Sequence, residues 1–345
     1  MRRSETRLLR VLESQGKKQK PAPETKCKLF LATLMRASAQ DRPFSPELQP
    51  AITVCPACNA TNQSQIAEIP DHEYGLAEVA RFAKCVECGT LFQFPMPDGA
   101  SLARFYPDDY HSMTHAGFLN RIRNGMRIRR LRKLAREKGP ILDFGCGDGA
   151  FLEQASESIC DRQLWGFEIA ERRSVKEANG GAVKIVRGDL RDLLEILPLC
   201  RLVTMNHVIE HLPDPAATTS ELVKRILPGG IFEGQTPAAD SLEHEVFGEK
   251  WSGYHAPRHT VVFSRSGLST MLKGCGLSSP VIEAGFNPAG IAVSLGSLGH
   301  QNGGRINRGE VKWLGLVAAA TLLAPIDLLS GQAGIMNFAA ERKSE

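Results

Sequence analysis

The sequence predicts an α/β protein, in which helices flank a mostly parallel sheet and a small cysteine-rich module precedes it. Two observations carry this prediction. Residues 141–144 form a short apolar run, typical of a buried parallel strand, and lead directly into the glycine-rich turn of residues 145–149 and then into a helical pattern. Further upstream, residues 55–58 and 85–88 are two CxxC pairs, a spacing typical of a metal-binding module.

The chain has 345 residues, enough for one α/β domain of about 200 residues or more with a small accessory module. A net charge of +4 is too modest to indicate nucleic acid by itself. Of the nine cysteines, four lie in the CxxC pairs and the others are scattered in apolar contexts, which favours a reducing compartment. Neither a signal peptide pattern nor an apolar run of about 18 residues is evident. We therefore expect a cytoplasmic protein.

Residues 1–50 are basic, then rich in Pro, Ser and Gln, without a sustained period, and we predict a disordered basic extension there. Residues 51–112 would form the metal-binding module and its linker. Residues 113–345 would form the α/β domain, with an insertion at about 288–330.

The two CxxC pairs supply four thiols that could surround one metal ion. Thiolates in a tetrahedron are the arrangement of a structural zinc site, and four protein ligands leave no position open for catalysis. Asn59 and Gly89 follow the pairs, and both residue types tolerate the left-handed backbone of tight metal-binding turns. Two redox pairs, or unbound thiols, are the alternatives. The expected zinc ligands are Cys55, Cys58, Cys85 and Cys88.

The glycine turn has the spacing GxGxG, with Ala150 where a dinucleotide-binding fingerprint has its third glycine. Asp143 precedes the turn and suits a cationic ligand group. Residues 163–168 predict a second strand that ends in Glu168, an acid placed to accept ribose hydroxyls. A third strand at 183–186 leads to Asp189, and a fourth at 202–206 leads to the segment HVIEHLPDP.

This series resembles the motifs of class I S-adenosylmethionine (SAM)-dependent methyltransferases. The resemblance implies a Rossmann-like sheet of seven strands, a transferase activity and SAM as the cofactor. The cysteine module looks like the small zinc-ribbon-like module that precedes the SAM domain in some sugar and antibiotic-pathway methyltransferases. The residues expected at the cofactor are Asp143, Gly145, Cys146, Gly147, Gly149, Glu168, Asp189, Leu190, Asn206 and His207.

Residues 118–138 hold nine Lys or Arg and one acid, and their apolar residues recur at roughly helical spacing. This predicts a basic amphipathic helix. It would either pack its apolar side on the sheet or offer a surface to an anionic substrate, a membrane or a nucleotide, and both can hold at once. The apolar positions are Phe118, Ile122, Met126, Leu131 and Leu134.

The segment HVIEH, residues 207–211, matches the HxxEH pattern of some zinc enzymes. That pattern must lie within a helix, whereas this segment begins at the end of a predicted strand and precedes Pro213. We therefore expect no catalytic metal there. Carboxyl ends of parallel strands are where α/β sites assemble, so His211 is a pocket candidate, with an ordinary buried histidine as the alternative.

A fifth strand at 231–234 leads into a polar loop rich in aromatic residues and histidines, which suits substrate capping and proton transfer. Residues 258–264 look like the Glu-His-x-x-x-Phe-Ser signature of sugar C-methyltransferases, but Arg258 stands where that signature has Glu. O-methylation is therefore at least as well supported as C-methylation. The expected catalytic residues are His259 as general base, His211 facing it, and Tyr254. The expected acceptor contacts are Arg258, His255 and Trp251.

The last part of the chain predicts a helix at 266–273, a sixth strand at 281–286 and a loop at 288–310. Residues 313–326 are uncharged and too short for a membrane span, so a packed or interfacial helix is expected, interrupted by Pro325 and Asp327. Residues 335–340 would be the seventh, antiparallel strand.

The leading hypothesis is methyl transfer from SAM to a small polar acceptor, a sugar or glycan precursor that is free, nucleotide-linked or lipid-linked. Because NHVIEHLPDP followed by LPGG also resembles ubiquinone-pathway O-methyltransferases, a quinone-type phenol is the first alternative. An RNA methyltransferase is disfavoured by the low net charge. A catalytically silent SAM-fold subunit is the remaining alternative. The sequence specifies neither the acceptor nor the oligomeric state.

Overall fold

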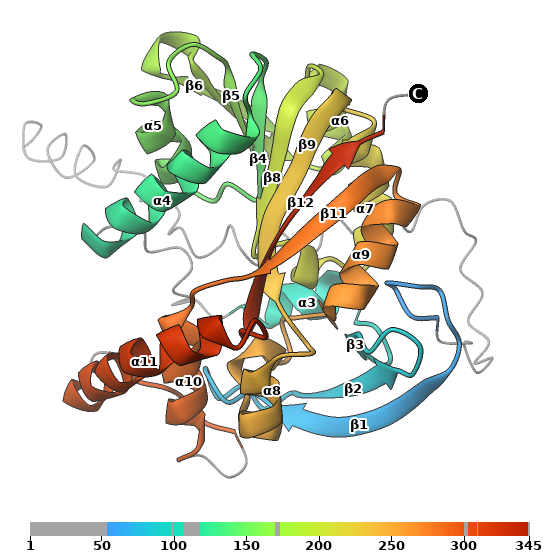
Figure 1. Ribbon diagram of the computed structural model, residues 1–345, viewed down its shortest axis with the longest axis vertical. Helices are drawn as coiled ribbons and strands as arrows, with labels where there is room; N and C mark the ends of the chain where they lie inside the picture. Colours follow the sequence, from blue (N-terminus) through green and yellow to red (C-terminus); the bar gives the residue numbers. More distant parts are fainter. Residues whose placement is uncertain are drawn as a thin grey trace, which may run out of the picture.

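The computed structural model describes residues 54–97, 99–106, 118–169, 173–299, 303–308 and 310–343. The predicted extension, residues 1–50, lies outside these ranges. Among the described residues, the strands form one sheet of eight and a second sheet of four. Figure 1 shows the large twisted sheet in the upper part of the molecule and the small sheet below it.

The large sheet has the strand order β11-β12-β9-β8-β4-β5-β7-β6. In this order, the adjacent strands β9, β8, β4, β5 and β7 are parallel to one another. Strand β12 runs antiparallel to both of its neighbours, β9 and β11. This confirms the α/β fold and the antiparallel last strand. The bounds are β4 Ile141–Phe144, β5 Leu164–Ile169, β6 Ser174–Ala178, β7 Val183–Gly188, β8 Cys200–Asn206, β9 Ile226–Pro237, β11 Leu277–Ala284 and β12 Ile335–Arg342.

The edge strand β6 is an addition to the predicted seven strands. It pairs antiparallel with β7. Its side chains are mostly exposed, so it lacks the buried apolar run by which the other strands were predicted.

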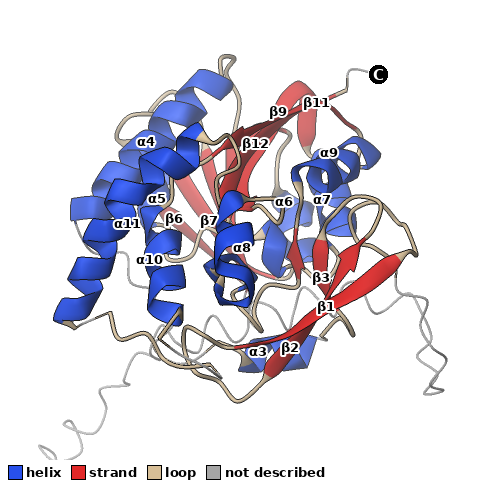
Figure 2. Ribbon diagram, turned by 60° about the horizontal axis from the view of Figure 1, so that its bottom comes forward, coloured by secondary structure: helices blue, strands red, loops and turns tan. Residues whose placement is uncertain are grey.

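Helices cover both faces of the large sheet, as Figure 2 shows. The order of the strands reverses at β4, which lies between β5 and β8, and in open α/β sheets ligands bind beyond the carboxyl ends of the strands at such a point. The flanking helices are α4 Phe118–Leu134, α5 Ala150–Ser156, α6 Leu190–Ile196, α7 Pro215–Val223 and α9 Arg265–Gly274. Further helices are α3 Gly99–Arg104, α8 Leu242–Phe247, α10 Pro288–Ser297 and α11 Val311–Leu329, with short 3-10 turns η2 Asn179–Gly181, η3 Ile209–His211, η4 Gly248–Lys250 and η5 Ser252–Tyr254.

The small sheet joins the cysteine module to the rest of the chain. Its order is β1-β2-β3-β10, and β10 pairs antiparallel with β3. Because β10 comes from the loop that carries His259, the sheet crosses the domain boundary expected near residue 112. The bounds are β1 Gln63–Pro70, β2 Val79–Cys85, β3 Leu91–Gln93 and β10 Val261–Val262.

The apolar face expected for α4 is wrong in part. Ile122 and Met126 are 47% and 61% exposed. The buried face is instead Asn124, Ile128 and Leu131, whose spacing of four and three follows the helical period. The predicted set mixed two sides of the helix, because apolar residues lie on both.

Two expectations for the carboxyl-terminal part are also wrong. Residues 288–297 form α10 and not a loop, since Asn287 caps the helix by accepting a hydrogen bond from the amide of Gly290 and Pro288 occupies its first turn. Helix α11 continues through Pro325 and Asp327 to Leu329 and is not interrupted there.

Candidate active site

The glycine turn after β4 leaves a place for a ligand. All three glycines have positive φ. A Cβ on Gly145 would lie 2.4 Å from Val208, and one on Gly149 would lie 2.2 Å from Ile185, so packing excludes side chains there. Gly147 faces open space. Neighbouring side chains therefore pack against Gly145 and Gly149, whereas the backbone at Gly147 is open to a ligand.

Glu168 ends β5 directly beside this turn. Its Oε2 accepts a 2.6 Å hydrogen bond from the amide of Gly147. The carbonyl of Gly147 accepts in turn from the guanidinium of Arg187 at 2.8 Å. Burial raises the pKa of Glu168 to about 7, against the hydrogen bond from Gly147 and the charge of Arg187. A buried acid at the end of the second parallel strand suits the ribose hydroxyls of a nucleoside.

Asp143 lies within β4 and is 3% exposed. Burial raises the pKa of its carboxyl, and Arg127 of α4 opposes this from 3.1 Å. The guanidinium carbon of Arg127 also lies 3.8 Å from the ring centre of Phe151 in α5. Helix α4 thus brings a cation to the acid that the sequence assigned to a cationic ligand group.

The remaining cofactor candidates lie at the carboxyl ends of β7 and β8. Asp189 caps α6 through a reciprocal pair of hydrogen bonds with Asp192. Asn206 ends β8 and donates to the hydroxyl of Thr204 at 2.6 Å. His207 has a positive φ of 53°. Leu190 and Cys146 are buried. All the predicted cofactor residues therefore lie at or next to one edge of the sheet.

A second cluster lies just beyond β8. The rings of His211 and His259 are 4.5 Å apart between centroids and nearly perpendicular, at 77°. Nε2 of His259 is 4.0 Å from Oε1 of Glu210. Glu210 also lies 3.2 Å from Nδ1 of His207, which connects the cluster to the cofactor edge.

The cluster combines neutral imidazoles with an ionised acid. Burial lowers the pKa of His211, and burial with the neighbouring histidines holds the pKa of His259 well below its usual range. Burial alone would raise the pKa of Glu210, but the hydrogen bond from His207, together with the attraction of any imidazole that is protonated, outweighs it and lowers that pKa to about 2. Neutral imidazole nitrogens next to a carboxylate can accept a proton.

Comparison with known proteins adds the decisive observation. Residues 120–279 match a family model described as a methyltransferase domain. A ubiquinone biosynthesis O-methyltransferase from Nitrosospira multiformis is 28% identical over 188 residues, which cover 50% of this chain and 77% of that protein. The protein of the same name from Chromobacterium violaceum is 27% identical over 169 residues, which cover 45% and 72%. The chain is a SAM-dependent methyltransferase.

Solved structures of other methyltransferases also resemble this one. A SAM-dependent methyltransferase from Archaeoglobus fulgidus aligns with a TM-score of 0.40 and 18% identity over 64% of this chain and 94% of that one. A phosphoethanolamine N-methyltransferase from Haemonchus contortus, in complex with SAM, aligns with a TM-score of 0.42 and 15% identity over 64% of this chain. The chain spans about half of that protein, 53% of its length.

The four CxxC cysteines converge as a metal site requires. The sulfurs of Cys55 and Cys88 are 3.7 Å apart, and those of Cys58 and Cys85 are 3.5 Å apart. A tetrahedron with Zn–S bonds of about 2.3 Å has edges of about 3.8 Å. The residues after the pairs, Asn59 and Gly89, have the left-handed φ values of 61° and 76°. The donor set and the spacing fit a structural zinc ion.

The structure does not bring Tyr254 and Trp251 to the histidine cluster. The hydroxyl of Tyr254 is 3.0 Å from Nε2 of His244, and Trp251 stacks on the His244 ring. Both side chains pack with Phe82 of the small sheet. Both are buried against the small sheet, and their expected roles in catalysis and at the acceptor stay predictions.

The side chains of Arg258 and His255 also contact acidic residues of the cysteine module. Arg258 is fully buried and forms an ion pair with Asp71. Nδ1 of His255 is 2.7 Å from Glu73, and its Nε2 accepts from Nε of Arg258. An acceptor would have to displace these buried contacts to reach the side chain of Arg258 or His255, so their expected role at the acceptor stays a prediction.

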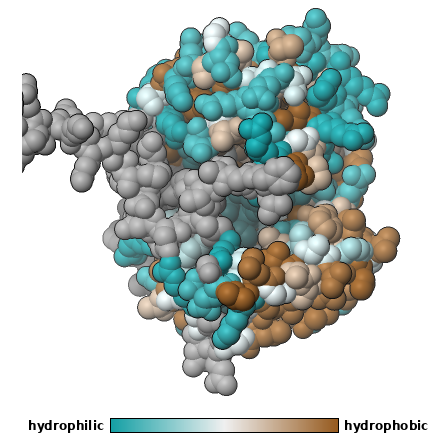
Figure 3. All heavy atoms as spheres, turned by 90° about the vertical axis from the view of Figure 1, so that its left-hand side faces the viewer, coloured by the Kyte–Doolittle hydropathy of each residue, from teal (hydrophilic) through white to brown (hydrophobic). Residues whose placement is uncertain are grey.

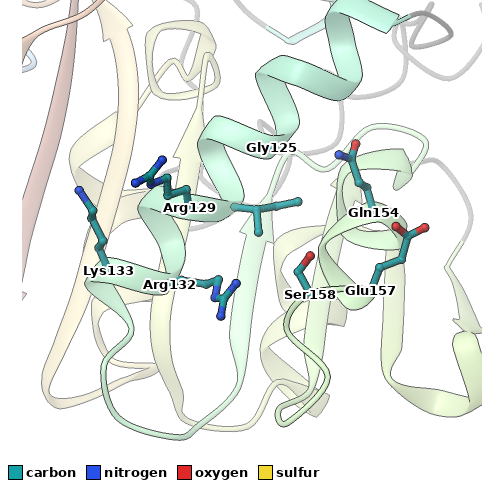
Figure 4. A pocket seen from close by; sticks show the side chains of 8 residues that line it. Gly125, Arg129, Arg132, Lys133, Gln154, Glu157 and Ser158 are labelled. Carbon is teal, nitrogen blue, oxygen red and sulfur yellow. The ribbon is translucent and has the colours of Figure 1, made fainter.

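A surface groove of about 540 Å³ lies between α4 and α5, lined by Arg129, Arg132, Lys133, Gln154 and Glu157 among others (Figure 4). Because α5 starts next to Gly149 and rises 1.5 Å per residue, Glu157 is about 10 Å from the glycine turn. The groove therefore belongs to the outer side of the domain and not to the cofactor edge.

Sequence reasoning missed Glu210 and Tyr106. Glu210 lies between two residues that were singled out, but a glutamate near a helix start is ordinary, and only its complete burial in η3 marks it. The hydroxyl of Tyr106 is 2.8 Å from Nδ1 of His211. No spacing in the sequence indicates that contact, which joins residues 105 positions apart.

Proposed function

We propose that this methyltransferase transfers the SAM methyl group to a hydroxyl of a small polar acceptor, and that the acceptor is activated at the cluster of Glu210, His211 and His259. The observation that carries the proposal is the place of this cluster. It follows β8, whose last residue is Asn206, and the side chain of His207 links it to the cofactor edge. A methyl acceptor must lie next to the cofactor for in-line transfer.

Methyl transfer to oxygen needs little covalent help from the protein. The oxygen, the methyl carbon and the sulfur must be held in line, water excluded and the hydroxyl proton removed. His259 and His211 are 6% and 7% exposed, which suits a site that keeps water away from the reacting groups. Their proximity to a carboxylate stabilises a positive charge that forms on a ring.

The acceptor we propose is a sugar or glycan precursor. The cysteine module ahead of the SAM domain and the Arg258-His259 segment with Phe263 and Ser264 support it, since both resemble features of sugar methyltransferases. A quinone-type phenol is the second candidate, and the names of the two curated relatives favour it. Both acceptors carry neighbouring oxygens, so one cluster can serve either.

A lipid-linked acceptor is the form of the substrate that the surface favours. Within the described residues, α11 is both long enough and apolar enough to cross a membrane. Only 17% of its most apolar 18-residue window is buried. Val311, Leu322 and Leu329 are 83%, 79% and 86% exposed. Figure 3 shows hydrophobic side chains gathered in the lower part of this face, where α10 and α11 lie, with hydrophilic ones above. We infer peripheral contact between α11 and an anionic bilayer, to which the arginines of α4 are complementary.

The function is tested with labelled SAM and three acceptor classes: nucleotide sugars, lipid-linked sugars and catechols. Product should form with one class, and His259→Gln should lower kcat by about 100-fold or more while SAM affinity stays within about twofold. His244→Gln is the matched control, because it changes another partly buried histidine that contacts Tyr254 and not the cluster. Equal activity in His259→Gln and wild type would contradict the proposed role of the cluster.

Membrane contact is tested separately by sedimentation with phosphatidylcholine vesicles, with and without phosphatidylglycerol. Binding should require the anionic lipid, and Leu322→Asp should weaken it several-fold. Val281→Asp alters an exposed valine of β11 and should have no effect. Binding that Leu322→Asp leaves unchanged, or dimerisation that it abolishes, would contradict the membrane assignment of α11.

A further inference from the structure

Three potential metal ligands lie close together next to His207, which contacts one of them, Glu210. One nitrogen of His211, one nitrogen of His259 and a carboxylate oxygen of Glu210 all lie within 4.8 Å of one another. The sequence did not predict a metal here, because the HxxEH pattern needs a single helix to present both of its histidines. In the structure the second histidine comes from a different segment, the loop before β10.

The hydrogen bonds of the two histidines orient them as metal ligands are oriented. Nδ1 of His259 is 2.9 Å from the carbonyl of Gly253, and Nδ1 of His211 is 3.2 Å from the carbonyl of Arg258. A carbonyl only accepts, so the ring of His259 donates from Nδ1 and keeps a lone pair on Nε2. Nδ1 of His211 also lies 2.8 Å from the hydroxyl of Tyr106, and the Nε2 lone pair of His211 is kept when that hydroxyl accepts from Nδ1. Histidines that bind metals commonly donate their other N–H to a carbonyl in this way.

Neighbouring side chains hold both oxygens of the Glu210 carboxylate. Oε2 of Glu210 accepts from the hydroxyl of Thr236 at 3.0 Å, and Oε1 is 3.2 Å from Nδ1 of His207. The 4.0 Å between Oε1 and Nε2 of His259 is too long for a hydrogen bond. Ligand bonds of about 2.1 Å would place N and O about 3.0 to 3.4 Å apart, so an ion fits between them after a shift of less than about 1 Å.

We propose that Glu210, His211 and His259 bind a divalent transition-metal ion such as Zn²⁺, Mn²⁺ or Co²⁺, with positions left open for two neighbouring oxygens of the acceptor. Three protein ligands with open positions are typical of catalytic metal sites, whereas the four cysteines form a closed one. The substrate class is then a vicinal diol or a catechol. This use of the site rests on the proposed function, but metal binding itself does not.

The chemistry of the step follows from the charge of the ion. With the ion bound, the nitrogens of His211 and His259 are ligands and no longer bases. The acceptor hydroxyl on the ion has a lowered pKa and loses its proton to solvent instead. An electron pair of that oxygen forms the new bond to the methyl carbon, while the C–S bond of SAM breaks and its electrons stay on sulfur. The products are the methyl ether, S-adenosylhomocysteine and one proton.

Cobalt substitution of the full-length protein distinguishes the two sites. Protein stripped of metal is loaded with Co²⁺, and bound cobalt per chain is counted together with its absorption spectrum. Thiolate-to-cobalt charge transfer in the near ultraviolet reports the cysteine site, whereas a nitrogen and oxygen site adds only weak visible bands. Wild type should bind two ions, one of each kind.

The variants His259→Gln and Glu210→Gln should bind one ion and keep the thiolate band, which shows in the same sample that the cysteine module is folded. His244→Gln is the control and should bind two. A wild-type protein that binds one ion, with the thiolate spectrum alone, would overturn the inference.

An activity measurement on the same samples separates this inference from the proposed function. Methyl transfer that depends on the second ion supports both. Transfer at the full rate with one ion bound contradicts the metal site and leaves the function standing. Two bound ions without transfer to any diol or catechol support the metal site and contradict the function.

Discussion

The guanidinium of Arg258 and the carboxylate of Asp71 form a bidentate ion pair, with both N···O distances at 2.9 Å, between residues 187 positions apart. Both side chains are fully buried. Asp71 directly follows β1 of the small sheet, and Arg258 precedes His259 of the active-site cluster. A desolvated pair of charges therefore joins the cysteine module to the segment that carries His259.

Removing one partner of this pair should destabilise the protein strongly. Arg258→Met leaves the Asp71 carboxylate buried without its counter-charge, and such changes cost about 3 to 5 kcal/mol. Urea unfolding should show this loss, and Asp71→Asn should show a similar one. Because the pair is structural, we expect lower stability and not a selective rise of KM for the acceptor.

The exposed pair of Arg81 and Glu68 is the matched control. Its side chains are 60% and 55% exposed, and Arg81→Ala should cost less than about 1 kcal/mol. If Arg258→Met were no more destabilising than Arg81→Ala, the structural role of the buried pair would be refuted.

Local patterns could be predicted from the sequence, whereas contacts between distant segments, such as that of Arg258, could not. Residues 141–149 and Glu168 were located because a buried strand, a glycine turn and a helix are local patterns. Arg258 was assigned to the acceptor because its guanidinium, in a polar loop next to His259, could hold a phosphate or carboxylate of the acceptor. Its partner lies in another sheet, and no local pattern records a contact over that separation.

The same reason explains the histidine cluster. The expected pair of His211 and His259 does come together, but its surroundings are Glu210 in η3 beside His211, Gly253 in η5 and Tyr106 after α3. Side-chain orientation and desolvation arise only from tertiary packing. They could not be predicted from spacing.

Loss of zinc should speed hydrogen exchange at residues 259–263 as well as in the cysteine module. β10 pairs with β3, and the hydroxyl of Ser264 donates to the carbonyl of Cys88. Structural zinc supplies on the order of 10 kcal/mol of folding free energy. Cys85→Ser should therefore abolish zinc binding and speed hydrogen exchange at residues 259–263, while β4, β5 and β8 keep their protection.

Cys160→Ser changes an exposed cysteine that is not one of the four expected zinc ligands, and it serves as the control. It should leave both zinc content and exchange unchanged. Slow exchange at residues 259–263 in zinc-free Cys85→Ser would disprove the coupling.

Glu168→Ala should weaken SAM binding at least tenfold. The acid is placed to accept both ribose hydroxyls, and each hydrogen bond to a charged group is worth about 1.5 to 3 kcal/mol. Titration calorimetry measures the change. Glu177→Ala removes a largely exposed acid from the edge strand β6 and should leave the affinity unchanged. Equal affinities for the two variants would reject the assignment of Glu168.

The last prediction concerns a buried pair of acids, Glu243 of α8 and Asp327 of α11, which are 5% and 7% exposed. Burial, followed by the charge of Asp327, raises the pKa of Glu243 to about 8. In the unfolded chain a glutamate titrates near about 4.3. Between these values the folded state binds more protons than the unfolded state, so this group makes stability fall as the pH rises towards 8. Below about pH 4 the effect is absent.

Glu243→Gln removes the ionisation and should raise the free energy of unfolding by about 1 to 3 kcal/mol at pH 8.5, with little change at pH 4.5. Urea unfolding at both pH values measures it. The exposed neighbour Glu245→Gln should show no such dependence. Hydrogen exchange supplies a second measure, because Asp327 also accepts from the amide of Gly334 and so ties α11 to the start of β12. Wild-type α11 should exchange faster as the pH approaches 8, after correction for the intrinsic rate, and Glu243→Gln should suppress that rise. A variant with the wild-type pH dependence in both measurements would show that the two acids do not share a proton.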